Sequence, residues 1–177
     1  PETGEEVPDG GVIRKGVGLK PAYLPQQVYF ANPHRNLIDT LIYDKNVSMQ
    51  VARNRLGSFQ FTGETQLKTV DMLSGGEKSR LRLCELMYDP LNLLILDEPS
   101  SALDPIAEYR IAKLIFDRSP TTTVMVAHRL STVVDADRIY LLSDGRIIES
   151  GTHAELMAQN GKYREMFLKQ AEGYLKA

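Results

Sequence analysis

A continuously apolar run at residues 93–96 ends in two adjacent carboxylates, Asp97 and Glu98, and no other segment constrains the fold as much. A short apolar run of this kind is typical of a strand buried on both faces. A second apolar strand is predicted at 123–127, and a helical pattern at 105–117 lies between the two. Strands that alternate with helices favour a parallel sheet flanked by helices, so the sequence predicts an α/β fold.

Two further regions flank this α/β pattern. Residues 22–24 predict a short strand that ends at Pro25, and helix-like spacing of apolar residues within 28–72 predicts a small helical subdomain. The further predicted elements are strands at 138–142 and 146–149, joined by an Asp144-Gly145 turn, and helices at 131–136, 153–159 and 161–175. We therefore divide the chain into 1–27, an N-terminal arm with a strand; 28–91, the helical subdomain; and 92–177, the rest of the α/β core with the C-terminal helices.

The composition excludes several classes of function. The 177 residues carry 21 Lys and Arg against 23 Asp and Glu, so no global positive charge attracts nucleic acid or anionic lipid. No apolar run reaches the roughly 18–20 residues that cross a bilayer, and no signal peptide is found, so we expect no direct membrane insertion. The single cysteine, Cys84, lies among leucines, which predicts a buried thiol, no intramolecular disulfide and a reducing, cytoplasmic setting.

An anion-binding pattern occurs at the start of a predicted helix. Ser74 and Glu77 have the spacing of a capping box, and the helix is expected to run from there to about Tyr88. The Ser74 hydroxyl and the amides of Gly75 and Gly76 would face an anion at the positive end of the helix dipole. The two glycines allow close approach because they carry no Cβ. We interpret the segment as a phosphate-binding site.

The paired carboxylates predict metal-dependent hydrolysis. Asp97, at the end of its strand, is placed to contact Mg²⁺ directly or through water. Glu98 should leave the strand in another direction, where it can orient or deprotonate an attacking water. Asp97 is therefore our candidate metal ligand, and Glu98 is our candidate catalytic base.

Two segments together resemble a known family. Leu-Ser-Gly-Gly-Glu at 73–77, followed by Leu-Leu-Ile-Leu-Asp-Glu-Pro at 93–99, resembles the nucleotide-binding domains of the ATP-binding cassette (ABC) family. The resemblance implies a P-loop NTPase-like fold, with a mostly parallel sheet, flanking helices and a small α-helical signature subdomain. It also implies ATP as the substrate and Mg²⁺ as the cofactor, and it places the nucleotide at Ser74, Gly75, Gly76 and Glu77.

The resemblance assigns roles to three residues outside these segments. His128 resembles the switch histidine, which contacts the γ-phosphate and the catalytic carboxylate, and it joins Glu98 as a catalytic candidate. Gln26 resembles the Q-loop glutamine, which senses Mg²⁺, contacts the nucleotide site and couples it to a transport domain. Asp104 ends a stretch similar to the D-loop, which crosses to the opposite subunit, and it is a further nucleotide-binding candidate.

The phosphate loop of the family is missing from the sequence. No G-x-x-x-x-G-K-[ST] pattern occurs in the 177 residues, and residues 1–5 resemble the turn that follows the Walker A helix. We therefore expect the Walker A lobe to be absent and the isolated chain to be inactive. A complementary Walker A-bearing lobe or a second nucleotide-binding domain is the expected partner, with a transmembrane transport domain near the Q-loop at the inner face of a membrane.

Three functions remain open on the sequence. The first is a partial ABC nucleotide-binding domain that supports ATP hydrolysis to drive transport, as the exporter-like residues 11–43 and 123–167 suggest. The second is a non-catalytic binding module, natural or engineered, that consists of the lobe with the Leu-Ser-Gly-Gly-Glu signature at 73–77. The third is a fragment of a ribosome-associated translation factor, which only residues 51–83 resemble, and the neutral-to-acidic charge balance weighs against it.

Overall fold

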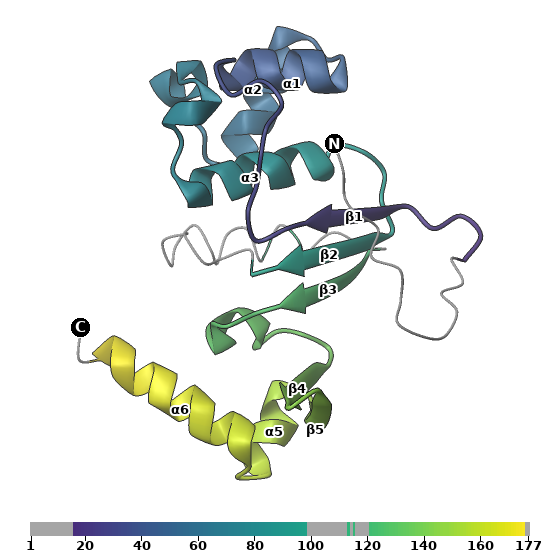
Figure 1. Ribbon diagram of the computed structural model, residues 1–177, viewed down its shortest axis with the longest axis vertical. Helices are drawn as coiled ribbons and strands as arrows, with labels where there is room; N and C mark the ends of the chain where they lie inside the picture. Colours follow the sequence, from purple (N-terminus) through teal and green to yellow (C-terminus); the bar gives the residue numbers. More distant parts are fainter. Residues whose placement is uncertain (1–15, 99–112, 114, 116–120, 176–177) are drawn as a thin grey trace.

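The computed structural model describes residues 16–98, 113, 115 and 121–175 (Figure 1). In these residues, three helices lie above a small parallel sheet, and a β-hairpin with two further helices lies below it. The described residues contain no helix that is long and apolar enough to cross a bilayer. The structure thus confirms the predicted α/β fold with a parallel sheet and flanking helices.

The central sheet pairs strands that are distant in the sequence. Its strands are β1 (Pro21–Leu24), β2 (Leu93–Asp97) and β3 (Thr122–Val126), in the order β1-β2-β3. Both pairings are parallel. Parallel neighbours need a long crossover, and the crossover from β1 to β2 carries the whole helical subdomain. Because all three strands run the same way, their carboxyl ends meet at one edge.

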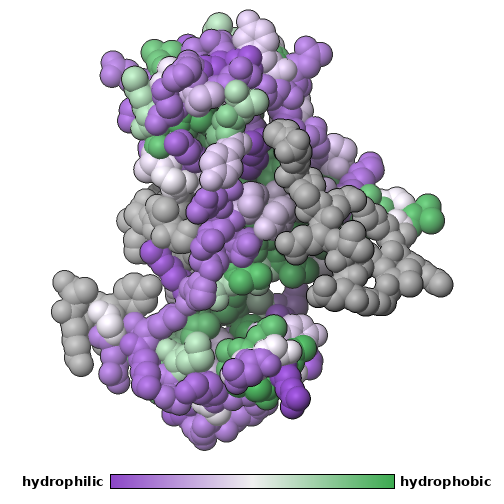
Figure 2. Space-filling view, in the orientation of Figure 1, coloured by the Kyte–Doolittle hydropathy of each residue, from purple (hydrophilic) through white to green (hydrophobic). Residues whose placement is uncertain are grey.

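The expectation that the apolar strands are buried on both faces is wrong for β3. Its side chains alternate between exposed and partly buried, and Val124 and Val126 are 50% and 53% exposed. In β2, by contrast, Leu94 and Leu96 are fully buried. Among the described residues, only one face of β3 packs on the core, through Met125. Hydrophobic residues are visible at the level of these strands in Figure 2.

The helical subdomain consists of short elements with clear caps. Asn36 caps the first helix by accepting from the Asp39 amide, and Ser48 caps the second by accepting from the Val51 amide. The third helix ends two residues earlier than the predicted Tyr88. The elements are α1 (Leu37–Lys45), α2 (Met49–Ser58), the 3-10 turns η1 (Gly63–Leu67) and η2 (Val70–Met72), and α3 (Gly75–Leu86).

One hydrophobic cluster joins these helices to the sheet. Leu24 of β1, Leu94 and Leu96 of β2 and Leu81 of α3 are all buried in it. Cys84, also on α3, is fully buried among them, and burial raises the pKa of its thiol to about 12. The prediction of a buried cysteine is therefore confirmed.

The C-terminal unit packs around a second cluster, formed by Leu130, Ile139, Leu156 and Tyr163. Its predicted strands and final helices are confirmed, and the strands pair antiparallel. The predicted helix at 131–136 is wrong, because a short 3-10 turn takes its place. Its elements are η3 (Leu130–Val133), β4 (Ile139–Ser143), β5 (Arg146–Gly151), α5 (His153–Ala158) and α6 (Lys162–Leu175).

Local hydrogen bonding explains the 3-10 turn. The Thr132 hydroxyl donates to the carbonyl of Arg129 at 2.6 Å, a contact that competes with α-helical bonding. Thr132, Val133 and Val134 are also β-branched and lose side-chain freedom in an α-helix. Helix 105–117 and Asp104 lie outside the described residues, apart from Lys113 and Ile115, which are helical.

Candidate functional site

The two carboxylates that end β2 face different neighbours. Asp97 is the last residue of the strand, and Glu98 follows with a φ of +47°, in the left-handed region. The amide of Glu98 donates to the carbonyl of Val126 at 3.0 Å, which ties the bend to β3. A non-glycine residue in this region is unusual and turns the chain sharply. The bend separates the surroundings of two adjacent acids.

Glu98 meets the other two strand ends. Gln26, which follows β1, donates from Nε2 to Glu98 Oε2 at 3.0 Å. His128, which follows β3, places Nε2 at 2.5 Å from Glu98 Oε1. The Glu98 side chain is 18% exposed and that of His128 is 80% exposed. Three of the candidate residues are thus brought together from sequence positions that lie far apart.

A tyrosine that the sequence analysis did not identify contacts Asp97. The Tyr23 hydroxyl donates to Asp97 Oδ2 at 3.3 Å. Burial, the Asp97 charge and this hydrogen bond raise the pKa of Tyr23. The strand register explains the contact, because Tyr23 pairs with Ile95 and Asp97 lies two residues further along the same face. Only the register of β1 on β2 could have indicated this contact from the sequence.

The predicted helix start at Ser74 is present, and its serine and glutamate are hydrogen-bonded to each other. Ser74 donates from its amide and its hydroxyl to Glu77 Oε2 at 2.8 and 2.9 Å, and the Glu77 amide returns a bond to the Ser74 hydroxyl. Burial opposes ionisation of Glu77, but these bonds and the charges of Lys68 and Arg80 hold its pKa below the ordinary value. Gly76 is buried, whereas Ser74 and Gly75 are exposed at the helix start.

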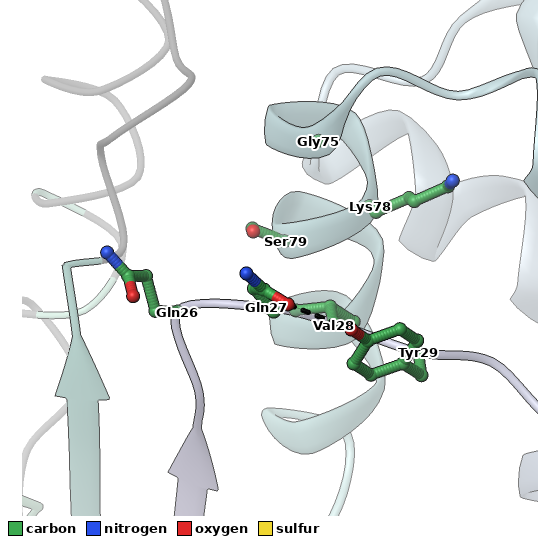
Figure 3. Close-up of a pocket in the computed structure, with 7 residues that line it drawn as sticks. All are labelled: Gln26, Gln27, Val28, Tyr29, Gly75, Lys78 and Ser79. Atoms are coloured by element: carbon green, nitrogen blue, oxygen red, sulfur yellow. Dashed lines mark hydrogen bonds between the residues drawn. The ribbon is translucent and has the colours of Figure 1, made fainter.

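A groove runs between α3 and the segment that follows β1 (Figure 3). Its volume is about 430 Å³. Inside it, the Tyr29 hydroxyl donates to Gln27 Oε1 at 2.8 Å. The lining residues are Gln26, Gln27, Val28, Tyr29, Gly75, Lys78 and Ser79. Gln26 lines the same groove as Gly75 and also bonds to Glu98, so one side chain borders both the groove and the carboxylate cluster.

The oxygen donors at the strand ends suit a magnesium ion that completes its shell with phosphate. Among the described residues, no cluster of three or more His, Cys, Asp or Glu side chains forms a full protein cage. Magnesium is usually held by one or two carboxylates plus substrate phosphates, so a cage is not required. Asp97 offers a carboxylate. Gln26 bonds to Glu98 through its side-chain nitrogen, so the Oε1 atom of Gln26 accepts no hydrogen bond within the described part of the chain.

The loop that carries His128 is attached to the C-terminal helix. Gln170 of α6 donates from Nε2 to the carbonyl of His128 at 2.7 Å. Its Oε1 accepts from the amide of Leu130 at 2.9 Å. Gln170 is not among the site residues predicted from the sequence, because no local pattern indicates a contact across 42 residues.

Comparison with known proteins gives a consistent family match. The family described as "ABC transporter" matches residues 4–101, more than half of the chain. The lactococcin-A transport/processing ATP-binding protein of Lactococcus lactis is 34% identical over 157 residues, which cover 82% of this chain and 22% of that protein. The mitochondrial iron-sulfur clusters transporter ATM1 of Candida glabrata is 34% identical over 173 residues, which cover 90% of this chain and 23% of that protein.

A solved structure supports the same relationship. The structure of a bacterial Atm1-family ABC exporter with ATP bound matches with a TM-score of 0.73 and 27% identity, covering 86% of this chain and 29% of that chain. The sequence thus spans less than a quarter of the length of the two curated relatives.

Proposed function

The chain is an exporter-type nucleotide-binding domain sequence of the ABC transporter family, and we propose that it hydrolyses ATP together with a Walker A-bearing partner to drive transport. One observation carries the proposal: Gln26 and His128 each hold one oxygen of Glu98 where the parallel strands end. In open α/β sheets, ligands bind at this edge.

Glu98 is positioned to take a proton from an attacking water. Its carboxylate can accept about four hydrogen bonds, and two neighbours occupy one position on each oxygen. The remaining lone pairs can receive a water, while Gln26 and His128 restrict the rotation of the side chain. Glu98 therefore acts as the base, and His128 and Gln26 orient it.

Asp97 and the helix start would hold the nucleotide. When bound, Mg²⁺ neutralises charge on the phosphate oxygens, and Asp97 with Gln26 Oε1 would be its protein ligands. The amide of Gly75, exposed at the start of α3, would donate to the γ-phosphate of ATP held by the Walker A-bearing partner, and the Ser74 hydroxyl would do so once it releases Glu77. Gly76 is buried next to these residues, and Glu77 would hold the helix start in place through its hydrogen bond with the Ser74 amide. We include Asp104 as a nucleotide contact from the family resemblance alone.

A partner would supply the phosphate-binding loop that the 177 residues lack. We propose that a Walker A loop outside the 177 residues, on a complementary lobe or a second nucleotide-binding domain, binds the phosphates of the nucleotide. We further propose that the groove beside Gln26 receives a transmembrane domain at the inner face of a membrane. The division at residues 27 and 91 would separate the arm, the signature subdomain and the rest of the core.

Complementation in trans tests this function. The Walker A-bearing part of an exporter nucleotide-binding domain is added to the 177-residue chain, and Mg²⁺-dependent phosphate release is measured. We expect release that Glu98→Gln lowers by about 10²–10⁴-fold, since a general base contributes this much. Glu172→Gln, which changes an exposed carboxylate on α6 in the same way, is the matched control and should leave the rate unchanged. A complex that forms, as shown by size-exclusion chromatography, but releases no phosphate would contradict the proposal.

A non-catalytic binding module is the second candidate. Such a module would associate with its partner without turnover. Phosphate release by the complex formed in the complementation assay distinguishes the two, because a module that only binds its partner should form the complex without turnover. Mg²⁺-dependent release by that complex would count against the second candidate.

A further inference from the structure

The Gln170 side chain spans two backbone groups of the loop that follows β3. Its amide nitrogen donates to His128 at 2.7 Å, and its amide oxygen accepts from Leu130 at 2.9 Å. The two polar atoms of the Gln170 side chain therefore bond to the backbone of the residues before and after residue 129. A pair of bonds in this arrangement fixes the direction of the loop as well as its position.

The loop depends on such a contact, because packing does not fix the His128 side chain. That side chain is 80% exposed, whereas Leu130, two residues on, is buried in the second hydrophobic cluster. The backbone between them decides whether the imidazole reaches Glu98. Gln170 bonds to that backbone directly.

The helix that carries Gln170 is itself anchored. Glu149 of β5 accepts from the amides of Lys162 and Tyr163 at 2.5 and 3.0 Å, which caps the start of α6. Tyr163 is fully buried, and Phe167 packs on the same cluster. Gln170 therefore projects from a helix held at its start and along its length.

We propose that Gln170 is a positioning residue that holds the His128 loop against α6, so that His128 stays on Glu98. The inference rests on the proposed function for the catalytic meaning of the His128–Glu98 contact. The contact itself can be measured without ATP. Through Gln170, the C-terminal helix sets the geometry of the strand-end cluster.

Nuclear magnetic resonance of the histidine rings tests the positioning role in the 177-residue chain. The ¹⁵N shift of His128 Nε2 reports its contact with Glu98, and Glu98→Ala marks the shift without that contact. We expect Gln170→Met to move the His128 resonance more than half of the way from its wild-type shift to the shift measured in Glu98→Ala. His34 and His153, which bond to Asp71 and Tyr163, serve as internal references and should not move.

A second glutamine gives the matched control. Gln159 is exposed at the end of α5, so Gln159→Met should leave all three histidine resonances in place. If Gln170→Met also shifts His153, the packing has changed, and Gln170→Glu then decides, because it keeps the size and the acceptor but loses the donor. A His128 resonance that stays at the wild-type position in a folded Gln170 variant overturns the proposal.

The complemented ATPase separates the two proposals. With phosphate release restored, Gln170→Met should lower kcat by up to about 10²-fold, because a misplacement of about 1 Å can cost this much, and leave the KM for ATP unchanged. If the ring resonance moves while complementation yields no activity in any variant, the positioning of His128 stands and the catalytic assignment falls. If complementation works and the ring does not move, the reverse holds.

Discussion

Glu85 on α3 is a carboxylate without full compensation in the core. Its side chain is 3% exposed, and Arg82 donates to Oε2 at 2.8 Å. Oε1 is also buried and has no hydrogen-bond partner among the described residues. Burial raises the pKa of Glu85 to about 7, although the Arg82 charge opposes this shift. The buried carboxyl group therefore makes folding sensitive to pH near neutrality.

The raised pKa of Glu85 determines whether stability increases or decreases with pH. Because the folded pKa of about 7 exceeds the ordinary value of 4.5, the folded state binds the proton more tightly. The contribution of this proton to the unfolding free energy is complete below pH 4.5, and about 3 kcal/mol is lost as the pH rises through 7. We expect urea denaturation to show this loss in the wild type relative to Glu85→Gln.

The exposed Glu64 provides the control for this pH effect, because Glu64→Gln should keep the wild-type slope. The test is the change with pH rather than the absolute stability, since the glutamine introduced by Glu85→Gln would also bury an amide. Parallel pH profiles for the wild type and Glu85→Gln would refute the assigned burial effect.

At the scale of elements, helix starts in this chain are determined by caps of two kinds. The Ser74–Glu77 and Thr152–Glu155 capping boxes are local and are readable from the sequence. The start of α6 instead depends on Glu149, a residue of β5. Gly161 leaves room for this cap, because a Cβ there would lie 2.5 Å from Glu149 Oε1 and would displace the carboxylate. The α6 cap is therefore a tertiary contact.

Removal of this cap should destabilise the C-terminal unit. We expect Glu149→Ala to lower its unfolding free energy by about 1–2 kcal/mol, as the loss of a helix cap does. Gly161→Ala should also be destabilising, because its Cβ displaces the carboxylate. Gly57→Ala in α2 meets nothing within 4 Å and should stabilise by up to about 1 kcal/mol. These predictions would be contradicted if thermal unfolding showed that Gly161→Ala and Gly57→Ala change the stability in the same direction.

At the scale of the whole molecule, the described residues bury two hydrophobic clusters that share no member. The first joins the helical subdomain to the sheet, and the second holds the C-terminal unit. Polar contacts bridge the site region between them, with His128 on Glu98 and Gln170 on the His128 loop. Such an arrangement allows one part to open while the other remains folded.

Hydrogen exchange can test this independence. Leu156→Ala removes a fully buried side chain from the second cluster and should cost about 2–5 kcal/mol. We expect faster amide exchange in α5, α6 and the β4–β5 hairpin, with unchanged rates in α1, α2 and α3. Leu56→Ala, in the first cluster, is the mirror control and should give the opposite pattern. Uniform acceleration in both variants would indicate a single cooperative unit.

Much of the fold could be predicted because its signals are local. The apolar run of β2, the Ser74–Glu77 capping box and the Asp144-Gly145 turn, both of whose residues have positive φ, are each decided by a few neighbouring residues. The turn at Leu130–Val133 was predicted as an α-helix because spacing alone does not reveal the Thr132 hydroxyl bond.

The strands, the helical subdomain, the buried Cys84 and the chemical types of the candidate site residues could be predicted from the sequence, whereas the 3-10 turn at Leu130–Val133 could not. The tertiary structure decided which residues meet: Glu98 with Gln26 and His128, Asp97 with Tyr23, and Gln170 with the His128 loop. It also decided that β3 has an exposed face. The physical reason is range. Caps and turns act within a few residues, whereas strand register and side-chain contacts across the fold depend on the packing of the entire chain.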